Sequence, residues 1–444
     1  MSSLSTQPYK GTRDFYPEDQ RLQNYIFSVW RKQARSFGYE EYQAPLLEPL
    51  ELFAAKSGQE IVSEQTYAFV DRGGRQVVIR PEMTPSVSRM VAARRQELAY
   101  PLRLYSIANF MRYERPQRGR EREFWQLNAD IFGVSSVDAE AEIITLADRI
   151  MKAFGASEKM YKIRINSRQL VNVMMAEYLE LDVVQSELMV RLFDRKDKIS
   201  REEFRDQAAA VFDAERSGQG LKKIAVLLGA KTMGELPQQL LKTAAVDEVR
   251  ALFTLLRERG IGNAVFDITL MRGFDYYSGI VFEIYDTNPE NSRSLFGGGR
   301  YDGLVGLFGV DNLPVVGMAP GATTLKDFLE AHKLIPQLLV ETDVYAIVLG
   351  PEAMPGAQAL AEKLRQEGVN ISVDISGRKV DKQIKTAVKS RVPFMLFLGQ
   401  QELADGMYTL KDVLKETEQK LSFERLVTVV KDYRRRGTGQ DDAV

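Results

Sequence analysis

The sequence lacks cysteine entirely and contains one histidine, His332, among 444 residues. Without cysteine there is no disulfide, no thiolate nucleophile and no cysteine-ligated zinc, and the composition fits a reducing compartment. A single histidine argues against a Ser-His-Asp triad, a histidine-rich metal site and a histidine general base. His332 falls in LKDFLEAHKL, whose apolar spacing is helical, so we expect it on a helix surface.

Long apolar runs and an excess of either charge are also missing. No run approaches the roughly 20 apolar residues that span a bilayer, and the N-terminal MSSLSTQPYKGTRD has no apolar signal core. Lys and Arg number 60 against 61 Asp and Glu, whereas a protein that binds nucleic acid over its whole surface is normally basic. We therefore expect a cytoplasmic protein without a membrane partner, in which any RNA contact is made by local patches.

Apolar periodicity predicts the secondary structure of the first part of the chain. Helical spacing from about residue 20 stops at Gly38, and a second helix, with Ser135 and Ser136 as candidate caps, stops at Gly155. That second helix has one apolar stripe, formed by Ile143, Ala147, Ile150, Met151 and Phe154. Strand-like segments, typical of an antiparallel sheet, occur at 42–53, 76–80, 101–113, 123–133 and 263–286.

The length allows about three domains. We expect the main, catalytic domain in two parts, 1–166 and 259–333, because strand character returns after a helical insertion at 167–258. Strands alternating with helices predict a separate α/β domain with a largely parallel sheet at 338–433. The tail at 434–444 follows, and the last residues, KDYRRRGTGQDDAV, are expected to fray.

The densest motif is MRYERPQRGREREFWQLNAD at 111–130, where two strand-like runs flank a turn rich in arginine. Guanidinium groups stay charged at cellular pH and offer two parallel donors to phosphate oxygens, so the motif indicates a polyphosphate or nucleic-acid site. A solvated, charged turn is the alternative, and the motif alone leaves both open. The arginines of the motif are Arg112, Arg115, Arg118, Arg120 and Arg122.

Neither common nucleotide-binding loop is present, because GxxxxGK[ST] does not occur and the GGG at 297–299 does not extend to GxGxxG. If ATP binds, side chains must hold it. Arg112, Arg122 and Arg272 stand in strand or turn contexts from which a guanidinium group can stabilise a phosphoryl group under in-line attack. This chemistry needs no covalent enzyme intermediate.

Polar residues for a small ligand occur on several segments. Gln126 and Asp130 lie four apart on a predicted strand and therefore share one face, which binds a polar or cationic ligand if it turns inward and is merely solvated if it does not. A second acceptor pair lies in RPEMTPS, and a tyrosine pair, which by itself more often packs in a core, lies beside Arg272 in RGFDYYSG. These two pairs are Glu82 with Thr84 and Tyr276 with Tyr277.

Together the motifs resemble those of the histidyl-tRNA synthetases, a branch of the class II aminoacyl-tRNA synthetases, along nearly the whole chain. The resemblance implies an α+β fold in which an antiparallel sheet is flanked by helices. It also implies a helical insertion that leans on the tRNA acceptor arm, a C-terminal α/β anticodon-binding domain and a homodimer built through motif 1. The matching segments are KGTRDFYP at 10–17, motif 1 around YQAPLLEP, RPEMT at 80–84, motif 2 from FMRYERPQRGR to FWQLNADIFG, RGFDYYSG at 272–279 and GGGRYDGLV at 297–305.

The resemblance further implies a histidine-tRNA ligase that activates L-histidine with ATP and Mg²⁺ to histidyl-adenylate and transfers it to the 3′ end of tRNA(His). Arg112 and Arg272 would be catalytic and face the α-phosphate, while Asp130 and Tyr277 would hydrogen-bond the imidazole. No protein ligand is assigned to magnesium. The residues implied to line the histidine and adenylate pocket are Glu82, Thr84, Arg112, Gln126, Asp130, Arg272, Tyr276 and Tyr277, and those of the loop between ATP and the tRNA acceptor end are Glu114, Arg118, Arg120 and Arg122.

Two positions depart from the family pattern. Thr324 stands in VVGMAPGATTL where the family usually has a motif 3 arginine over ATP, with Arg293 and Arg300 as candidate substitutes, although Arg300 has a structural alternative. Asp130 stands where the family usually has glutamate.

These departures leave other functions open. One is a catalytically inactive, synthetase-like regulatory subunit of ATP phosphoribosyltransferase, and another is a synthetase-like enzyme that charges something else. Regulatory paralogues generally lack the anticodon domain, so the region 338–433 favours the synthetase. The residues of RGFDYYSG favour histidine as the amino acid.

Overall fold

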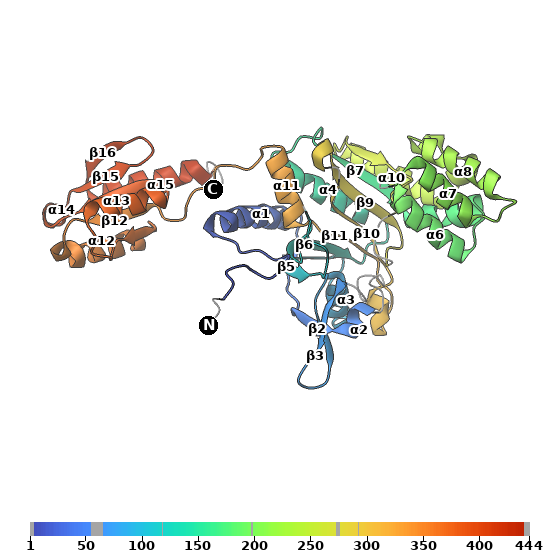
Figure 1. Cartoon of the computed structure of the whole chain (residues 1–444), viewed down its shortest axis with the longest axis horizontal. Coiled ribbons are helices and arrows are strands. Elements are labelled where there is room, and N and C mark those ends of the chain that lie inside the picture. The colour runs from blue at the N-terminus through green and yellow to red at the C-terminus, as the bar shows by residue number, and fades with distance from the viewer. Residues whose placement is uncertain are drawn as a thin grey trace. The chain divides into compact units, whose positions relative to one another are not determined.

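The computed structural model describes residues 4–54, 65–117, 119–196, 199–271, 276–291 and 293–438. For residues 436–438 it describes the backbone alone. The chain forms two compact units, Met1–Ile335 and Pro336–Val444 (Figure 1). Among the described residues, no helix combines the length and the apolar character that crossing a bilayer requires. Arg118 and Arg272 lie outside the described residues, and so do 439–444.

The first unit is built on an eight-stranded sheet in the order β1-β5-β6-β11-β10-β9-β7-β8. Its outermost pairs, β1 with β5 and β7 with β8, are parallel, and all pairs between them are antiparallel. The fold is therefore α+β with the antiparallel sheet that the sequence predicted. The strands are β1 Glu40–Glu41, β5 Leu102–Met111, β6 Glu123–Phe132, β7 Tyr161–Ser167, β8 Ala264–Phe266, β9 Ile280–Asp286, β10 Ser294–Arg300 and β11 Val315–Met318.

Helices α1 (Pro17–Ser36), α4 (Asp138–Ala153), α10 (Ala244–Glu258) and α11 (Ala322–Ala331) contribute to the large apolar core of this sheet. The predicted stripe of α4 is buried in that core, and both helix ends are confirmed, since Gly38 and Gly155 have the positive φ typical of a residue after a helix. The predicted serine caps are wrong. Ser136 donates its hydroxyl to the Asp138 carboxylate, and the capping position is Val137.

The predicted strand at 42–53 is wrong for most of its length. Only β2 (Leu47–Pro49) is a strand, and α2 (Leu50–Ala54) follows it directly. An apolar run this short is compatible with a strand or a helix, and the side chain of Phe53 on α2 is fully buried. Strand β2 joins β4 (Gln76–Ile79) and β3 (Tyr67–Val70) in a three-stranded sheet, after which α3 (Thr84–Ala93) begins. Likewise, within 263–286 only β8 and β9 are strands among the described residues.

The region predicted to be a helical insertion is helical and has a core of its own, which includes Leu170, Met189, Phe204 and Leu227. Figure 1 shows α6, α7 and α8 grouped beyond the end of the sheet that carries β7. The domain boundaries at 166, 258 and 333 stay predictions. The elements are α5 Arg168–Val173, the π-helical turn η2 Met174–Tyr178, α6 Val183–Asp194, α7 Arg201–Val211, α8 Ser217–Gly229, the 3₁₀ turn η4 Met233–Glu235 and α9 Gln238–Leu241.

The second unit has a five-stranded sheet in the order β13-β12-β14-β15-β16, in which the first three strands are parallel and the last two antiparallel. Helices α12 and α15 pack on one face and α13 on the other. Helix α15 continues to Thr438, into the segment predicted as the tail, and the boundary of the tail stays a prediction. The elements are β12 Val344–Val348, α12 Met354–Gln366, β13 Ile371–Val373, α13 Val380–Lys389, β14 Phe394–Leu398, α14 Gln400–Asp405, β15 Tyr408–Asp412, β16 Thr417–Leu421 and α15 Phe423–Thr438.

The single histidine is not on a helix surface as predicted. His332 is the residue that ends α11, its side chain is only 14% exposed, and its ring packs 4.6 Å from that of Phe328. Its Nε2 lies 2.7 Å from an oxygen of Asp286 at the end of β9. This partner is 46 residues away in sequence, so helical spacing gave no sign of it.

The glycines of β10 allow its neighbours to approach closely. A Cβ at Gly298 would overlap the carbonyl oxygen of Gly317 and lie 2.9 Å from the Cα of Met318. Both are backbone atoms of the paired strand β11, so no side-chain rotation relieves the contact.

We predict that Gly298→Ala lowers the free energy of unfolding by about 1–3 kcal/mol, because strand β11 must shift to make room. Thermal and denaturant unfolding measure the loss. The matched control is Gly218→Ala on α8, where a Cβ meets nothing within 4 Å. Equal stability of the two variants would contradict the close approach of β10 and β11.

Candidate active site

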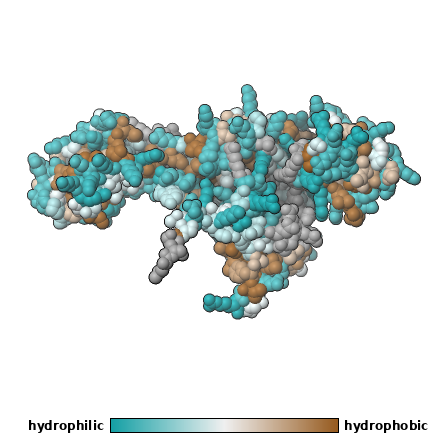
Figure 2. Space-filling view, viewed as in Figure 1, coloured by the Kyte–Doolittle hydropathy of each residue, from teal (hydrophilic) through white to brown (hydrophobic). Residues whose placement is uncertain are grey.

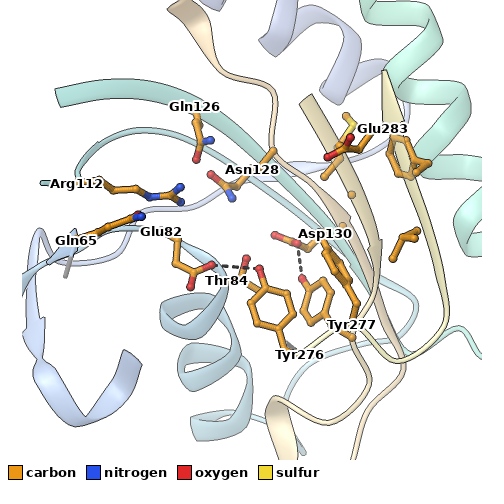
Figure 3. A pocket seen from close by; sticks show the side chains of 18 of the residues that line it. Gln65, Glu82, Thr84, Arg112, Gln126, Asn128, Asp130, Tyr276, Tyr277 and Glu283 are labelled. Atoms are coloured by element: carbon orange, nitrogen blue, oxygen red, sulfur yellow. Dashed lines mark hydrogen bonds between the residues drawn. The ribbon is translucent and has the colours of Figure 1, made fainter. Parts of the chain in front are cut away.

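A cavity of about 540 Å³ opens over the middle of the main sheet, and side chains from well-separated parts of the chain line it (Figure 3). Strand β6, the start of α3 and the segment before β9 contribute most of the polar groups. The residues of the lining used below are Gln65, Glu82, Thr84, Arg112, Glu114, Arg120, Gln126, Asn128, Asp130, Asp194, Tyr276, Tyr277, Glu283, Gly298, Tyr301 and Gly317.

Strand β6 presents three polar side chains to the cavity at alternate positions, Gln126, Asn128 and Asp130. Their spacing of two puts them on one face of the strand, as predicted for the first and last of them. Asp130 pairs with Gly317 of β11, where a Cβ would overlap the Asp130 carboxylate. A glycine at that position is therefore required, because the carboxylate occupies the space that a Cβ would fill.

Asp130 is the most deeply buried carboxylate of the cavity, with 2% of the residue exposed. Tyr301 donates its hydroxyl to Oδ1, while Oδ2 is buried and accepts no hydrogen bond among the described residues. Burial raises the pKa of Asp130 from 3.8 to about 7, against the opposing effect of the Tyr301 hydrogen bond. Asn128 Oδ1 is also buried without a donor in the described part of the chain, so this end of the cavity offers acceptors to a ligand.

A second carboxylate, that of Glu82, lies at the start of α3. Tyr276 donates its hydroxyl to Glu82 Oε2 at 3.1 Å, and burial, followed by the charge of Glu82, raises the pKa of Tyr276 well above its ordinary value. The ring of Tyr277 meets that of Tyr276 edge-on at 5.1 Å, and burial likewise raises the pKa of Tyr277. Both phenols thus stay protonated near neutral pH and can donate hydrogen bonds.

Arg112 supplies positive charge to the cavity. Its Nε donates to the carbonyl of Pro81 at 2.9 Å, and its guanidinium lies 5.3 Å from the centre of the Phe124 ring. Figure 3 shows the side chain beside Gln65 and Glu82, away from Asp130. Arg120 also lines the cavity and donates to Glu114 Oε2 at 3.1 Å.

The structure therefore brings together most of the predicted site residues around one cavity. These are Glu82, Thr84, Arg112, Glu114, Arg120, Gln126, Asp130, Tyr276 and Tyr277. Arg118 and Arg272 lie outside the described residues.

Arg122 is not among the residues that line the cavity. It is buried, donates to the Tyr9 hydroxyl at 3.0 Å and to the Glu114 carbonyl at 3.2 Å, and its guanidinium lies 4.0 Å from the centre of the Tyr113 ring. These contacts connect the N-terminal segment to the motif 2 turn. Among the described residues, Arg122 therefore stabilises the conformation of the turn.

The position of the missing motif 3 arginine is also outside the lining. Thr324 donates its hydroxyl to the Leu295 carbonyl at 2.7 Å. Arg300 forms a buried double hydrogen bond with Glu140, at 2.7 Å from both nitrogens, so it is structural and does not replace the arginine. Arg293 is exposed, donates to Gln117 at 2.9 Å and likewise does not line the cavity.

Sequence reasoning missed several residues of the lining. Asn128 follows from the same period of two that identified Gln126 and Asp130. Tyr301 lies in the GGGRYDGL motif, but its role depends on a partner 171 residues away. Asp194 comes from the helical insertion, and no sequence signal points to it.

The arrangement suits a ligand whose parts differ in charge and in hydrogen-bonding character. Buried acceptors at Asp130 and Asn128 fit a donor-bearing polar group, Glu82 fits a cation, and Arg112 with Arg120 fits an anion such as phosphate. Among the described residues, no group of three or more His, Asp or Glu is placed to hold a metal ion.

Comparisons with known proteins agree with this arrangement. The family model for histidyl-tRNA synthetase matches residues 11–325, and that for an anticodon binding domain matches residues 343–433. A histidine-tRNA ligase of Leptospira biflexa is 40% identical over 432 residues, which cover 97% of this chain and 98% of the relative.

Two solved structures show the same fold. A histidyl-tRNA synthetase from Nostoc sp. has a TM-score of 0.81 at 22% identity, with 97% of this chain and 100% of that chain covered. A Bacillus halodurans protein described as an ATP phosphoribosyltransferase regulatory subunit/histidyl-tRNA synthetase has a TM-score of 0.71 at 24% identity, with 89% and 99% covered.

We predict that Tyr301→Phe moves the titration of Asp130 from about 7 to higher pH, because the charged carboxylate loses its hydrogen bond. The folded-state pKa lies above the ordinary 3.8, so this group lowers stability as pH rises from about 4 through 7. Carbon-13 NMR of the aspartate carboxyls measures the pKa. A carboxyl that titrates at an unchanged or lower pH in the variant would contradict the contact.

Proposed function

Because this chain belongs to the histidyl-tRNA synthetase family, we propose that its main cavity joins L-histidine to ATP and passes the histidyl group to tRNA(His). The observation that supports this most is the set of buried acceptors on β6 facing Arg112 across one cavity. A single pocket thereby offers partners for an imidazole, an ammonium group and a phosphate.

Histidine lies with its ring toward Asp130. The free Oδ2 accepts a ring N–H, and the neutral Tyr277 phenol donates to the other nitrogen or to a water beside it. The ammonium group of the amino acid pairs with Glu82, which Tyr276 holds in place. An amino acid without the ring leaves the buried acceptors of β6 without a donor, which penalises its binding.

ATP lies toward the arginines. Arg112 screens the repulsion between the histidine carboxylate and the α-phosphate while the carboxylate oxygen bonds to phosphorus and pyrophosphate leaves with its electron pair. By the family resemblance Arg272 acts on the same phosphate, and Arg120 with Glu114 positions the nucleotide. The 3′-terminal hydroxyl of the tRNA then attacks the histidyl carbonyl carbon, and AMP leaves.

Magnesium enters with ATP as part of the substrate. The described residues offer no three-ligand cluster, so the ion is held chiefly by the phosphate oxygens. When bound, the ion neutralises charge on the leaving pyrophosphate.

The second unit takes part as an anticodon-binding domain, in keeping with the family match over residues 343–433. This match, together with the retained polar cavity, favours the ligase over an inactive regulatory subunit. The cysteine-free composition supports a cytoplasmic location.

The small sheet around motif 1 supports the homodimer. Leu47 on β2 and Phe69 and Val70 on β3 are 49%, 47% and 62% exposed, and Leu46 is exposed beside them. Figure 2 shows apolar side chains gathered over the part of the first unit that carries β2 and β3. Exposed apolar side chains gathered on one small sheet in this way are typical of a subunit contact.

We predict that Arg112→Ala lowers histidine-dependent exchange of labelled pyrophosphate into ATP by a factor on the order of 10² to 10³, because one charge-stabilising donor is lost. The matched control is Arg115→Ala, since Arg115 is exposed on the same turn and does not line the cavity. Equal exchange by both variants would remove Arg112 from catalysis. Wild-type protein that neither exchanges nor charges a tRNA(His) transcript would favour the regulatory subunit.

We expect Arg272→Ala to abolish the exchange of labelled pyrophosphate into ATP, because Arg272 stands beside the tyrosine pair in the motif RGFDYYSG. Single-turnover measurement separates binding from chemistry, and the histidine affinity should change less than the rate. Activity within a few fold of wild type would exclude the catalytic role.

Replacing Leu47 and Phe69 by aspartate should turn a dimer into a monomer, because each change buries a charge in the apolar contact. Light scattering after size-exclusion chromatography measures the mass. Val184→Asp on α6, which replaces an exposed apolar residue away from this sheet, serves as control and should leave the dimer intact. A wild-type monomer, or a variant that stays dimeric, would contradict the proposal.

A further inference from the structure

The second unit has a strongly basic segment around α13. Between residues 378 and 391 the sequence contains six basic residues and a single acidic one, Asp381. The packed side of α13 is fixed by Gln383 and Ala387, which are buried against the sheet.

Three lysines occupy the opposite side of this helix. Lys382, Lys385 and Lys389 are spaced by three and four residues, so they form one stripe, and all three are exposed. We call this stripe the α13 lysine face. Helix α13 packs on one side of the sheet, and α12 and α15 pack on the other side.

Unlike several other basic residues of the unit, the lysines of this face form no ion pair with a described residue. Lys411 pairs with Glu418, Lys415 with Asp412 and Lys431 with Glu367. Across the described residues, no carboxylate oxygen lies within 4.0 Å of Lys382, Lys385 or Lys389. Three like charges on adjacent turns repel each other, so the face is set up for a polyanion.

The turn before α13 is ordered and carries an exposed apolar side chain. Asp374 accepts hydrogen bonds from the backbone N–H of Ser376, from Tyr345 and from Arg378, and these bonds help lower the pKa of Asp374 below its ordinary value despite burial. Between them Ile375 is 74% exposed. A fixed apolar group next to a cationic stripe suits a nucleic acid, which has both phosphates and base faces.

We propose that the α13 lysine face binds the sugar-phosphate backbone of tRNA next to the anticodon, which rests on the proposed function of the second unit. The charge of the whole chain is only -1, so general attraction to RNA is weak and a local stripe has to supply it. Contacts to phosphates position the RNA without reading its sequence, and they leave base recognition to other groups.

The test compares two triple variants of the full chain that remove the same charge. One is Lys382→Ala, Lys385→Ala, Lys389→Ala. The control is Lys363→Ala, Lys420→Ala, Arg425→Ala, which changes exposed basic residues of the same unit on α12, β16 and α15. Fluorescence anisotropy with labelled tRNA(His) transcript and with an unrelated tRNA gives affinities over a range of salt, and thermal unfolding with Lys→Gln versions checks the fold.

The α13 variant should bind both tRNAs on the order of tenfold more weakly at low salt, with a log-log salt slope smaller by about 2 to 3. Pyrophosphate exchange should stay at the wild-type level, because the cavity of the first unit is unchanged. This separates the proposal from the proposed function, whose failure would instead abolish exchange in wild-type protein. Equal affinities for the two triple variants, or a loss confined to tRNA(His), would overturn the backbone contact.

Discussion

The fit of an imidazole to the cavity depends on one buried carboxylate, that of Asp130, which lies over a glycine of the neighbouring strand. Strand β6 lies between β5 and β11, and Gly317 on β11 leaves the space that the carboxylate fills. Tyr301 occupies one oxygen and leaves the other for a ligand. Because burial makes the charged form costly, the site favours a ligand that brings its own N–H donor, which an imidazole does.

Much of the architecture follows from periodicity. The alternating runs at 101–113 and 123–133 form the hairpin of β5 and β6, and the apolar stripe of α4 packs against the sheet as expected. The strand prediction for 42–53 was wrong because a short apolar segment fits a strand or a helix equally well, and here its second half forms α2 with Phe53 buried.

The site was harder to predict from the sequence because its contacts join segments that are far apart in the chain. Arg112 and Arg122 flank the same turn, and their backbones even pair, yet only Arg112 lines the cavity. Arg122 instead contacts Tyr9 and Tyr113. The contact with Tyr9 requires the N-terminal segment to pack onto the turn. The roles of Tyr301 and His332 likewise depend on partners brought close by the sheet.

The most direct measurement is a crystal structure of the chain with a non-hydrolysable histidyl-adenylate analogue. We predict a ring nitrogen within about 3.2 Å of Asp130 Oδ2 and the phosphate mimic in hydrogen-bond contact with the Arg112 guanidinium. An analogue whose ring binds away from Asp130, or that occupies another part of the chain, would contradict this prediction.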